Sequence, residues 1–234
     1  MSVGGVALAA AAGAAAVGLY GALEPNNSLF GRVVGRGARD RRVYLTFDDG
    51  PNQDATPLVL DILAREAVPA TFFLVGGHVR RFPDIARRIA ADGHAIGNHT
   101  DSHQRLHLAG PRRIAEELGR AHDAIAQATG VEPLLFRAPH GYRNPFVLSE
   151  ARRRGYRILG WTFGVWDTAR PGSQEIRRRI RHGLRPGSIL LLHDGDGYDP
   201  FGDRLQTAHA LPGIIEDVRA PGYSFAPVSQ LFAA

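Results

Sequence analysis

The stretch Tyr44-Leu-Thr-Phe-Asp-Asp-Gly-Pro51 is the part of the sequence from which the expected fold can be worked out. Four residues of β-strand character lead into two adjacent carboxylates, and Gly50-Pro51 then ends the strand in a turn. Side chains alternate along a strand, so Asp48 and Asp49 should have different neighbours. Two like charges this close cost free energy unless a cation or an arginine separates their roles. The stretch therefore predicts a functional site at a strand end, with an acidic turn in solvent as the alternative.

The overall composition is that of a globular protein. The 234 residues are 44% hydrophobic and 22% charged, which suits one domain of barrel or layered α/β type. All 28 basic residues are arginine, and the net charge is +5. The arginines are scattered and form no stripe with aromatic residues, so we expect a solvated surface and no nucleic-acid partner. Cysteine is absent, which excludes disulfides and thiolate catalysis and leaves histidine and carboxylate as metal ligands.

The first part of the chain is an uncharged run rich in alanine and glycine. Residues 3–23 match the length of a membrane-spanning helix of roughly 20 residues, although Ala and Gly contribute little to partitioning into lipid. No basic residue precedes the run, whereas arginines follow it at 32, 36, 39, 41 and 42. We interpret residues 1–24 as a signal anchor or uncleaved export segment, with membrane attachment through residues 3–23. The alternative is an Ala-rich soluble helix or a mis-assigned start.

The domain organisation follows from this interpretation. Residues 25–41 contain Pro25-Asn-Asn-Ser28 and several glycines, and they are expected to form a linker. Residues 42–234 are expected to form a single folded domain. We expect a monomer that is membrane-anchored or exported to the cell envelope, in preference to a cytoplasmic protein.

From residue 42 onward, short apolar runs alternate with amphipathic stretches about seven times. The expected strands are 43–47, 70–75, 95–98, 134–137, 157–162, 188–193 and 224–228. The expected helices are 56–66, 84–92, 112–129, 145–154, 173–182 and 204–220. Such alternation predicts a parallel sheet with helices outside, and seven units fit a (β/α) barrel better than an open sheet.

Polar side chains follow the ends of these strands, the edge at which parallel α/β folds collect their functional residues. They are Asp48, Asp49, His99, His103, Arg137, His140, Asp167, His193 and Asp194. His99 and His103 are spaced i, i+4, so on a helical turn both imidazoles project from one face. Two histidines with one carboxylate form a standard site for a divalent cation, whereas the pair alone would fit a surface or capping role.

Five ordered segments resemble the motifs of the polysaccharide deacetylases, the NodB-homology group known as carbohydrate esterase family 4. They are Thr46-Phe-Asp-Asp-Gly-Pro51, His99-Thr-x-x-His103, Arg137-Ala-Pro-His-Gly141, Trp161 through Asp167, and Leu191-Leu-His-Asp194. The resemblance extends over about residues 42–232. It implies a distorted, TIM-like (β/α)7 barrel and metal-dependent removal of acetyl groups from N-acetylated sugars.

The resemblance also implies a set of metal ligands and a base. Asp49, His99 and His103 would hold the metal, with Zn²⁺ as the expected ion and Co²⁺, Ni²⁺ or Mn²⁺ as alternatives. Asp48 would be the general base, because a base must not itself be locked on the metal. Arg137 resembles the arginine that keeps this base ionised and oriented, with an ordinary ion pair as the alternative.

The remaining implied roles concern the leaving group and the acetyl group. His193 resembles the general acid that protonates the leaving amine, and Asp167 the carboxylate that keeps this imidazole charged and aligned. The backbone N–H of His140 would bind the oxyanion. Leu191 occupies the position that faces the acetyl methyl. The alternatives are a turn-capping role for Asp167 and an ordinary core position for Leu191.

Two positions depart from the family pattern. The third motif usually has an aromatic residue where His140 stands, and the fourth usually continues from its Asp into Trp, whereas here Thr168 follows and Trp166 precedes. Neither change removes a metal ligand or the base. We therefore expect that activity is kept and that substrate specificity is altered.

These observations favour an enzyme that de-N-acetylates a GlcNAc-containing glycan, namely peptidoglycan or a chitin-like oligosaccharide. A first alternative is O-acetyl esterase action on xylan-like polymers. A family offshoot that acts on small cyclic ureides or amides is disfavoured because both histidines of the second motif are present. An alternative of another class is a glycan-binding barrel without catalysis, which the full set of a base, an acid and metal ligands argues against.

Overall fold

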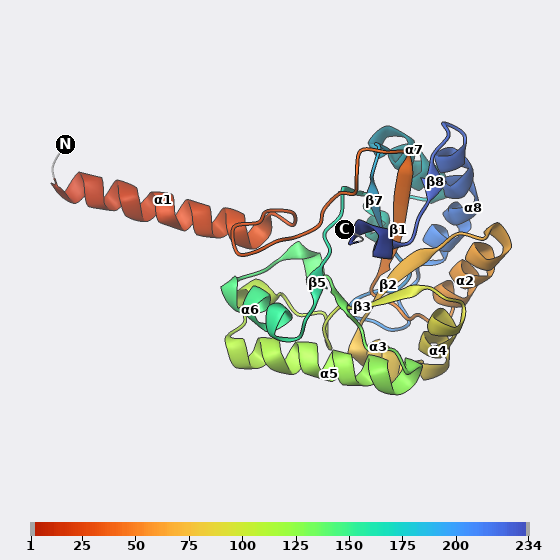
Figure 1. Ribbon diagram of the computed structural model, residues 1–234, viewed down its shortest axis with the longest axis horizontal. Coiled ribbons are helices and arrows are strands. Elements are labelled where there is room, and N and C mark those ends of the chain that lie inside the picture. Colours follow the sequence, from red (N-terminus) through yellow and green to blue (C-terminus); the bar gives the residue numbers. More distant parts are fainter. Residues whose placement is uncertain (1–2, 233–234) are drawn as a thin grey trace.

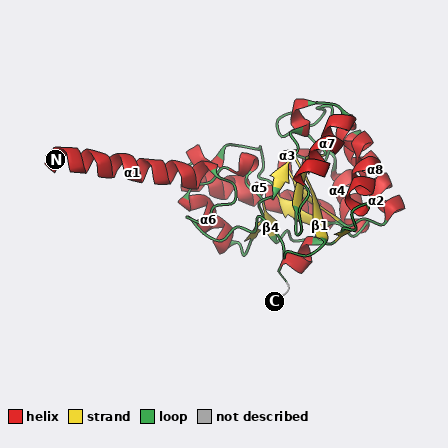
Figure 2. Cartoon of the chain, turned by 90° about the horizontal axis from the view of Figure 1, so that it is seen from above, coloured by secondary structure: helices red, strands yellow, loops and turns green. Residues whose placement is uncertain are grey.

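The central element of the computed structural model is a curled sheet in which every strand pair is parallel (Figures 1 and 2). Its strands are β1 (Arg42–Asp48), β2 (Ala70–Leu74), β3 (Ala95–Asn98), β4 (Leu135–Phe136), β5 (Arg157–Ile158), β6 (Phe163–Gly164), β7 (Ile189–His193) and β8 (Ser224–Phe225). The order across the sheet is β5-β4-β3-β2-β1-β7-β6, and β8 pairs with the start of β1. The structure describes residues 3–232, without the side chains of residues 3–10 and 14.

Helices surround the convex side of this sheet (Figure 1). They are α2 (Ala55–Glu66), α3 (Gly76–Arg81), α4 (Pro83–Ala91), α5 (Pro111–Thr129), α6 (Pro145–Arg153), α7 (Ser173–Gly183) and α8 (Leu205–Arg219). Neighbouring helices pack in a row: α7 on α8, α8 on α2, α2 on α4, α4 on α5, and α5 on α6. The expected distorted (β/α)7 fold is therefore confirmed.

The alternation of side chains along β1 explains how the strand serves two different cores. Val43, Leu45 and Phe47 are buried against the surrounding helices in the largest hydrophobic cluster. Tyr44 and Thr46 lie on the opposite face, inside the curl of the sheet. Asp48 continues that inner face, so the alternation carries its carboxylate into the interior of the barrel.

The barrel is left open between its two edge strands. β5 and β6 do not pair with each other in the described part of the chain, and Leu159 instead forms an isolated parallel bridge with Val34. The side chain of Asn26 donates to the carbonyl oxygen of Trp161 at 2.8 Å and thereby bridges to the same region. Part of the segment between residues 25 and 41 thus packs into the open side of the barrel.

Three details differ from the sequence-based expectation. The strand predicted at 157–162 is shortened to β5 (157–158), followed by the isolated bridge from Leu159 to Val34, and β6 begins at residue 163, beyond the predicted end. Helix α3 was not predicted, since its six residues begin with two glycines and show no apolar period. Helix α2 begins at Ala55, before Pro57, because the side chain of Asn52 accepts the N–H of Ala55 at 2.9 Å.

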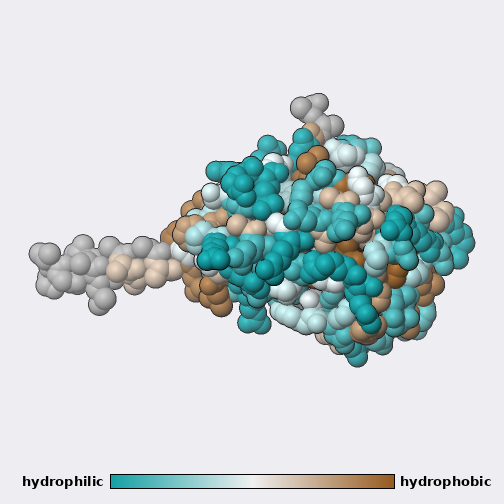
Figure 3. Space-filling view, turned by 90° about the horizontal axis from the view of Figure 1, so that it is seen from below, coloured by the Kyte–Doolittle hydropathy of each residue, from teal (hydrophilic) through white to brown (hydrophobic). Residues whose placement is uncertain are grey.

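The first helix, α1 (Val3–Leu23), projects from the domain (Figures 1 and 2). Within residues 3–232, no helix combines the length and the apolar character needed to cross a membrane. The face of the domain seen in Figure 3 is largely hydrophilic, with smaller apolar patches.

Candidate active site

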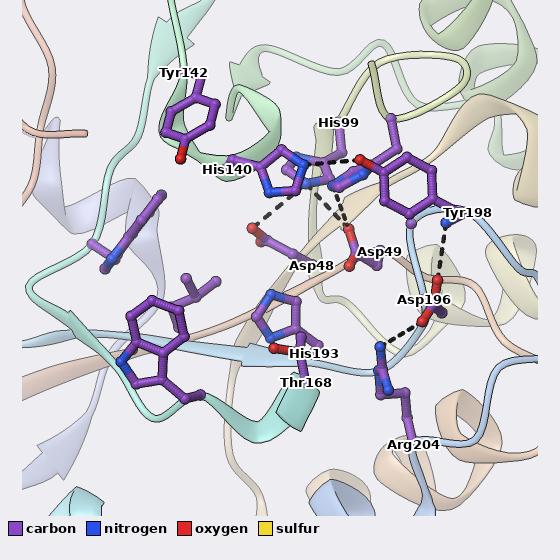
Figure 4. A pocket seen from close by; sticks show the side chains of 16 residues that line it. Asp48, Asp49, His99, His140, Tyr142, Thr168, His193, Asp196, Tyr198 and Arg204 are labelled. Carbon is purple, nitrogen blue, oxygen red and sulfur yellow. Dashed lines mark hydrogen bonds and ion pairs between the residues drawn. The ribbon is translucent and has the colours of Figure 1, made fainter. Parts of the chain in front are cut away.

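A pocket of about 500 Å³ opens where β1, β3 and β7 end and their loops begin (Figure 4). The convergence is expected, because the carboxyl ends of parallel strands meet at one edge of a sheet. The predicted residues that line it are Asp48, Asp49, His99, His103, His140, Leu191 and His193. Arg137 and Asp167 are fully buried behind this lining. Arg137 contacts Asp48 and His99, and Asp167 contacts His193.

Asp49, His99 and His103 form the centre of the pocket floor. Oδ1 of Asp49 lies 3.3 Å from Nε2 of His99 and 3.1 Å from Nε2 of His103. The candidate ligand atoms of the three residues all lie within 4.8 Å of one another, and all three residues are buried. This grouping is the one that the family resemblance implied.

The two histidines do not lie on a helical turn, so that part of the sequence-based expectation was wrong. Residues 99–103 form a bent loop in which Thr100 and His103 have positive φ angles of 70° and 53°. Asp49 also has a positive φ, of 74°. Left-handed backbone is unfavourable for residues other than glycine, and it tends to occur at sites that the surrounding structure holds in place. The loop brings both imidazoles to Asp49 by this strained path.

Glu117 of α5 is a buried carboxylate that holds the histidine loop in place. Its Oε2 accepts the backbone N–H groups of Asp101 at 3.1 Å and Ser102 at 2.9 Å. Its Oε1 accepts the hydroxyl of Ser102 at 2.8 Å and forms an ion pair with Nη2 of Arg113 at 2.7 Å. Both oxygens are thus used to fix the backbone between the two histidines.

The donor set fits a divalent cation. Nδ1 of His99 must donate to the carbonyl oxygen of Arg137, 2.8 Å away, because a carbonyl only accepts. In the neutral imidazole the lone pair on Nε2 then faces Asp49, whose buried Oδ1 has no hydrogen-bond partner in the described part of the chain. Two acceptors this close require a positive charge between them, and the backbone contact to the far nitrogen is typical of metal-bound histidine. When the imidazoles of His103 and His99 are protonated instead, their charge and N–H donation outweigh burial and hold the pKa of Asp49 well below the usual range.

Asp48 has different partners from Asp49. Its Oδ1 accepts a hydrogen bond of 2.6 Å from Nη1 of Arg137, while its Oδ2 lies 3.7 Å from Nε2 of His99. Arg137 is fully buried inside the barrel, and its guanidinium stacks 4.2 Å from the ring centre of Phe73. It also donates to Thr46 at 2.8 Å. Burial lowers the pKa of Arg137, and the Asp48 carboxylate acts against that shift.

His193 and Asp167 form the second polar pair of the site. Nδ1 of His193 donates to Oδ1 of Asp167 at 2.8 Å, and its backbone N–H donates to Oδ2 at 2.8 Å. The hydroxyl of Thr207 also donates to Oδ2, at 3.0 Å. Burial alone would lower the pKa of His193, but Asp167 outweighs it and raises the pKa to about 9. The ring is therefore held protonated, with Nε2 on the side away from Asp167.

His140 and Leu191 lie on different walls of the pocket. His140 has a positive φ of 58°, and within residues 3–232 no oxygen accepts a hydrogen bond from its backbone N–H. Its ring meets the ring of His103 edge-on, with centroids 4.9 Å apart. Leu191 pairs with Thr46 of β1 and contributes an apolar wall next to Gly164. The structure thus brings every predicted site residue to the pocket or directly behind it.

Several residues of the site were not singled out from the sequence. Tyr142, Asp196, Tyr198 and Arg204 line the same pocket, and Glu117 supports it from α5. Tyr198 and Asp196 do lie in the loop that follows His193, and position after a strand end was the available signal. Glu117 had no such signal, because its role depends on how α5 packs against the loop.

Comparison with known proteins places this geometry in context. Residues 35–159 match the model of the family described as polysaccharide deacetylase. A chitooligosaccharide deacetylase of Rhizobium leguminosarum bv. trifolii is 40% identical over 200 residues, which cover 83% of this chain and 93% of that protein. A peptidoglycan-N-acetylglucosamine deacetylase of Bacillus cereus is 35% identical over 194 residues, covering 82% of this chain and 88% of the relative. The solved structure of a peptidoglycan N-acetylglucosamine deacetylase has a TM-score of 0.80 and 30% identity, over 86% of this chain and 94% of the other.

Proposed function

Because this chain belongs to the polysaccharide deacetylase family, we propose that it hydrolyses the acetamido group of GlcNAc residues in a glycan and releases acetate. One observation carries the proposal. Two adjacent carboxylates at the end of β1 are divided between a histidine pair and a buried arginine, and a protonated histidine lies at the end of the neighbouring strand β7. These are the groups that hydrolysis of an amide requires: a cation site, a base and an acid.

Asp49, His99 and His103 are the residues that would hold the metal. Two histidines and one carboxylate leave coordination positions free, as in catalytic zinc sites, so Zn²⁺ is the ion that we propose, with Co²⁺, Ni²⁺ and Mn²⁺ as replacements. When bound, such a cation polarises the amide carbonyl and makes a water acidic enough to ionise near neutral pH.

Asp48 is proposed to take the proton of the attacking water. Its Oδ1 is engaged by Arg137, which holds the carboxylate in a fixed orientation, and Oδ2 remains available. The water oxygen then adds to the carbonyl carbon, and the carbonyl oxygen gains negative charge. The backbone N–H of His140, which has no acceptor within residues 3–232, is the proposed donor to that oxygen.

His193 is proposed to complete the reaction as the general acid. Its Nε2 delivers a proton to the amide nitrogen as the C–N bond breaks, so the products are acetate and the free amine of the sugar. Asp167 holds the ring by Nδ1 and keeps it protonated, which is a positioning role because the carboxylate does not touch the substrate. After the products leave, Asp48 loses to solvent the proton that it took from water, and His193 regains a proton from solvent, so both groups return to their starting states.

The substrate class follows from the relatives and from the pocket. The similar proteins named above are deacetylases of chitooligosaccharide and of peptidoglycan N-acetylglucosamine. The wall around Leu191 is apolar and suits an acetyl methyl, and aromatic side chains line the outer part of the pocket. We therefore propose a β-1,4-linked GlcNAc oligomer or polymer as substrate.

The test is acetate release from three substrates: GlcNAc oligomers, purified peptidoglycan and acetylated xylan, each with added Zn²⁺. Release from the first or second, with little from xylan, is the expected result. Release from acetylated xylan alone would replace the proposal by O-acetyl esterase action. Binding of the oligomers without any acetate release would identify a glycan-binding barrel without catalysis.

A further inference from the structure

The loop that follows β7, residues 194–204, forms one wall of the pocket and carries Tyr198 toward the histidines. The hydroxyl of Tyr198 and Nε2 of His140 are hydrogen-bonded at 3.0 Å (Figure 4). The Tyr198 ring also meets the ring of His103 edge-on, with centroids 5.0 Å apart and planes at 86°. Tyr198 therefore connects the loop after β7 with the loop after β4, across one side of the pocket.

A buried arginine fixes this loop. Arg204 is 4% exposed, and it donates to the carbonyl oxygen of Gly195 at 2.8 Å and to Oδ2 of Asp196 at 2.7 Å. The other oxygen of Asp196 accepts the backbone N–H of Tyr198 at 3.1 Å. Farther along the loop, Phe201 packs edge-on against Phe82 of the segment before α4, with centroids 5.6 Å apart. The backbone that carries Tyr198 is thus held in place at several points.

Although these contacts fix its position, Tyr198 is 64% exposed. A second aromatic ring on the pocket lining, Trp166, is 75% exposed. Single exposed aromatic residues are ordinary, but two of them on the lining of one pocket form an apolar surface that faces incoming ligand. A ring that is ordered before binding loses little conformational entropy when a ligand covers it. The exposed ring face of Tyr198 is therefore suited to binding.

The position of Tyr198 indicates which part of a glycan it contacts. Leu191 and His193 lie on β7, on the side of the pocket assigned to the acetyl group and the leaving nitrogen. Tyr198 contacts His103 and His140, so its ring lies on the side of the pocket floor that carries the proposed metal ligands. When the acetamido group of one sugar reaches the pocket floor, the Tyr198 ring is positioned to contact the next sugar of the glycan. The C–H groups of that sugar form a flat apolar face.

We propose that Tyr198 is a specificity-determining residue that stacks on the sugar next to the one being deacetylated, with His140 holding its hydroxyl. The proposal rests on the proposed function, because it takes a GlcNAc oligomer as the ligand. It also gives His140 a side-chain role. His140 stands where the third motif of the family usually has an aromatic residue, and its imidazole is the hydrogen-bond partner of Tyr198.

The experiment measures binding in the Asp48→Asn background, in which removal of acetyl groups is slowed so that the oligomers stay acetylated during the measurement. Calorimetry with the GlcNAc dimer and tetramer compares this parent with Tyr198→Ala and Tyr198→Phe, all loaded with Zn²⁺. We expect Tyr198→Ala to weaken tetramer binding about tenfold, which corresponds to about 1.4 kcal/mol, and to change dimer binding less. Tyr198→Phe keeps the ring and loses the hydroxyl, so its affinity for the tetramer should lie between those of the parent and Tyr198→Ala. Phe146→Ala, which removes an exposed aromatic ring outside the pocket, is the matched control and should bind as the parent does.

The outcomes separate this inference from the proposed function, because acetate release by the unmodified protein is measured on the same tetramer. If acetate is released but Tyr198→Ala binds the tetramer as tightly as the parent, the inference is wrong and the proposed function stands. A loss of bound Zn²⁺ in Tyr198→Ala would assign the ring to support of His103 and overturn the inference. If the unmodified protein releases no acetate from any GlcNAc substrate, the proposed function is wrong. The assignment of a GlcNAc oligomer as the ligand of Tyr198 is then wrong as well.

Discussion

Asp48 and Asp49 are adjacent in the chain, but the nearest partners of their carboxylates differ. Asp48 accepts a hydrogen bond of 2.6 Å from the buried Arg137, whereas Asp49 lies 3.1 Å from Nε2 of His103. The separation arises because Asp48 continues the inner face of β1, while Asp49 takes a left-handed conformation with φ of 74°. This difference is the basis for giving the two carboxylates unlike roles.

Asp48→Asn should abolish most of the activity while the metal site remains. The amide can still accept the hydrogen bond from Arg137, but it cannot take a proton from water. We expect kcat to fall by about 10² to 10⁴, the usual contribution of a general base, with unchanged Zn²⁺ content. Acetate release and metal analysis measure the two effects. Asp61→Asn, which removes an exposed carboxylate of α2 that pairs with Arg88, is the control. Turnover near the normal rate in Asp48→Asn would exclude the assignment.

Asp167→Asn should change how the rate depends on pH. The pKa of His193 is about 9, so its acid form is present below that pH and is lost as the pH rises through it. Without the carboxylate, the pKa of His193 should move toward about 6.5, the ordinary histidine value. The decline of kcat at high pH should therefore move to lower pH, and the pH profile of acetate release measures it. A high-pH decline that stays in place would show that Asp167 does not set the charge of His193.

The same pair also links stability to pH. Because the pKa of His193 is raised in the folded protein, its contribution to the free energy of unfolding is fully present below about pH 6.5 and is lost as pH rises through about 9. Asp167→Asn should remove this dependence, which urea unfolding at several pH values would detect.

Glu117→Gln should weaken metal binding although Glu117 touches no metal ligand. An amide nitrogen in place of one carboxylate oxygen would face N–H or O–H donors instead of accepting from them, so the loop between His99 and His103 should lose part of its anchoring. We expect the Zn²⁺ affinity to fall about 10- to 100-fold, as for other residues that support metal ligands, measured by competition with a chelating dye. Glu116→Gln, at the neighbouring position where the side chain pairs with exposed Arg112, should leave the affinity unchanged. Equal affinities in the two variants would contradict a supporting role for Glu117.

Arg137→Met should destabilise the fold, since it leaves the Asp48 carboxylate buried without its partner. Removing one member of a buried ion pair costs about 3–5 kcal/mol, and urea unfolding measures this free energy. Arg153→Met removes an exposed arginine from its ion pair with Glu150, which keeps Arg154 as a partner, and should destabilise the fold much less. Comparable losses in the two variants would show that the pair between Arg137 and Asp48 is no more important than a surface contact.

The residues at the strand ends could be predicted because parallel strands bring their carboxyl ends to one edge. That rule places Asp48, His99 and His193 together without knowledge of the packing, and the order of their motifs identifies the family. Strand and helix boundaries were close for the long elements, where the apolar period is clear. In α5, Ile114, Leu118, Ala121 and Ile125 recur at helical spacing in the sequence, and all four are buried.

The parts that could not be predicted depend on contacts between distant segments. Glu117 is an ordinary helix residue in sequence, and only the packing of α5 against the histidine loop reveals its role. The hydrogen bond between Tyr198 and His140 joins residues 58 positions apart in two loops that have no periodic pattern. The conformation of residues 99–103 was also predicted incorrectly, because the i, i+4 spacing is compatible with a strained loop as well as with a helical turn.

The proposed deacetylase activity depends most directly on the metal-binding role of Asp49, His99 and His103. The decisive measurement is Zn²⁺ titration of chelator-treated protein, with acetate release from a GlcNAc tetramer followed at each point. We predict no release from the metal-free protein, full recovery at one Zn²⁺ per chain, and no recovery in Asp49→Ala. Full acetate release by protein shown to be free of metal would contradict the account.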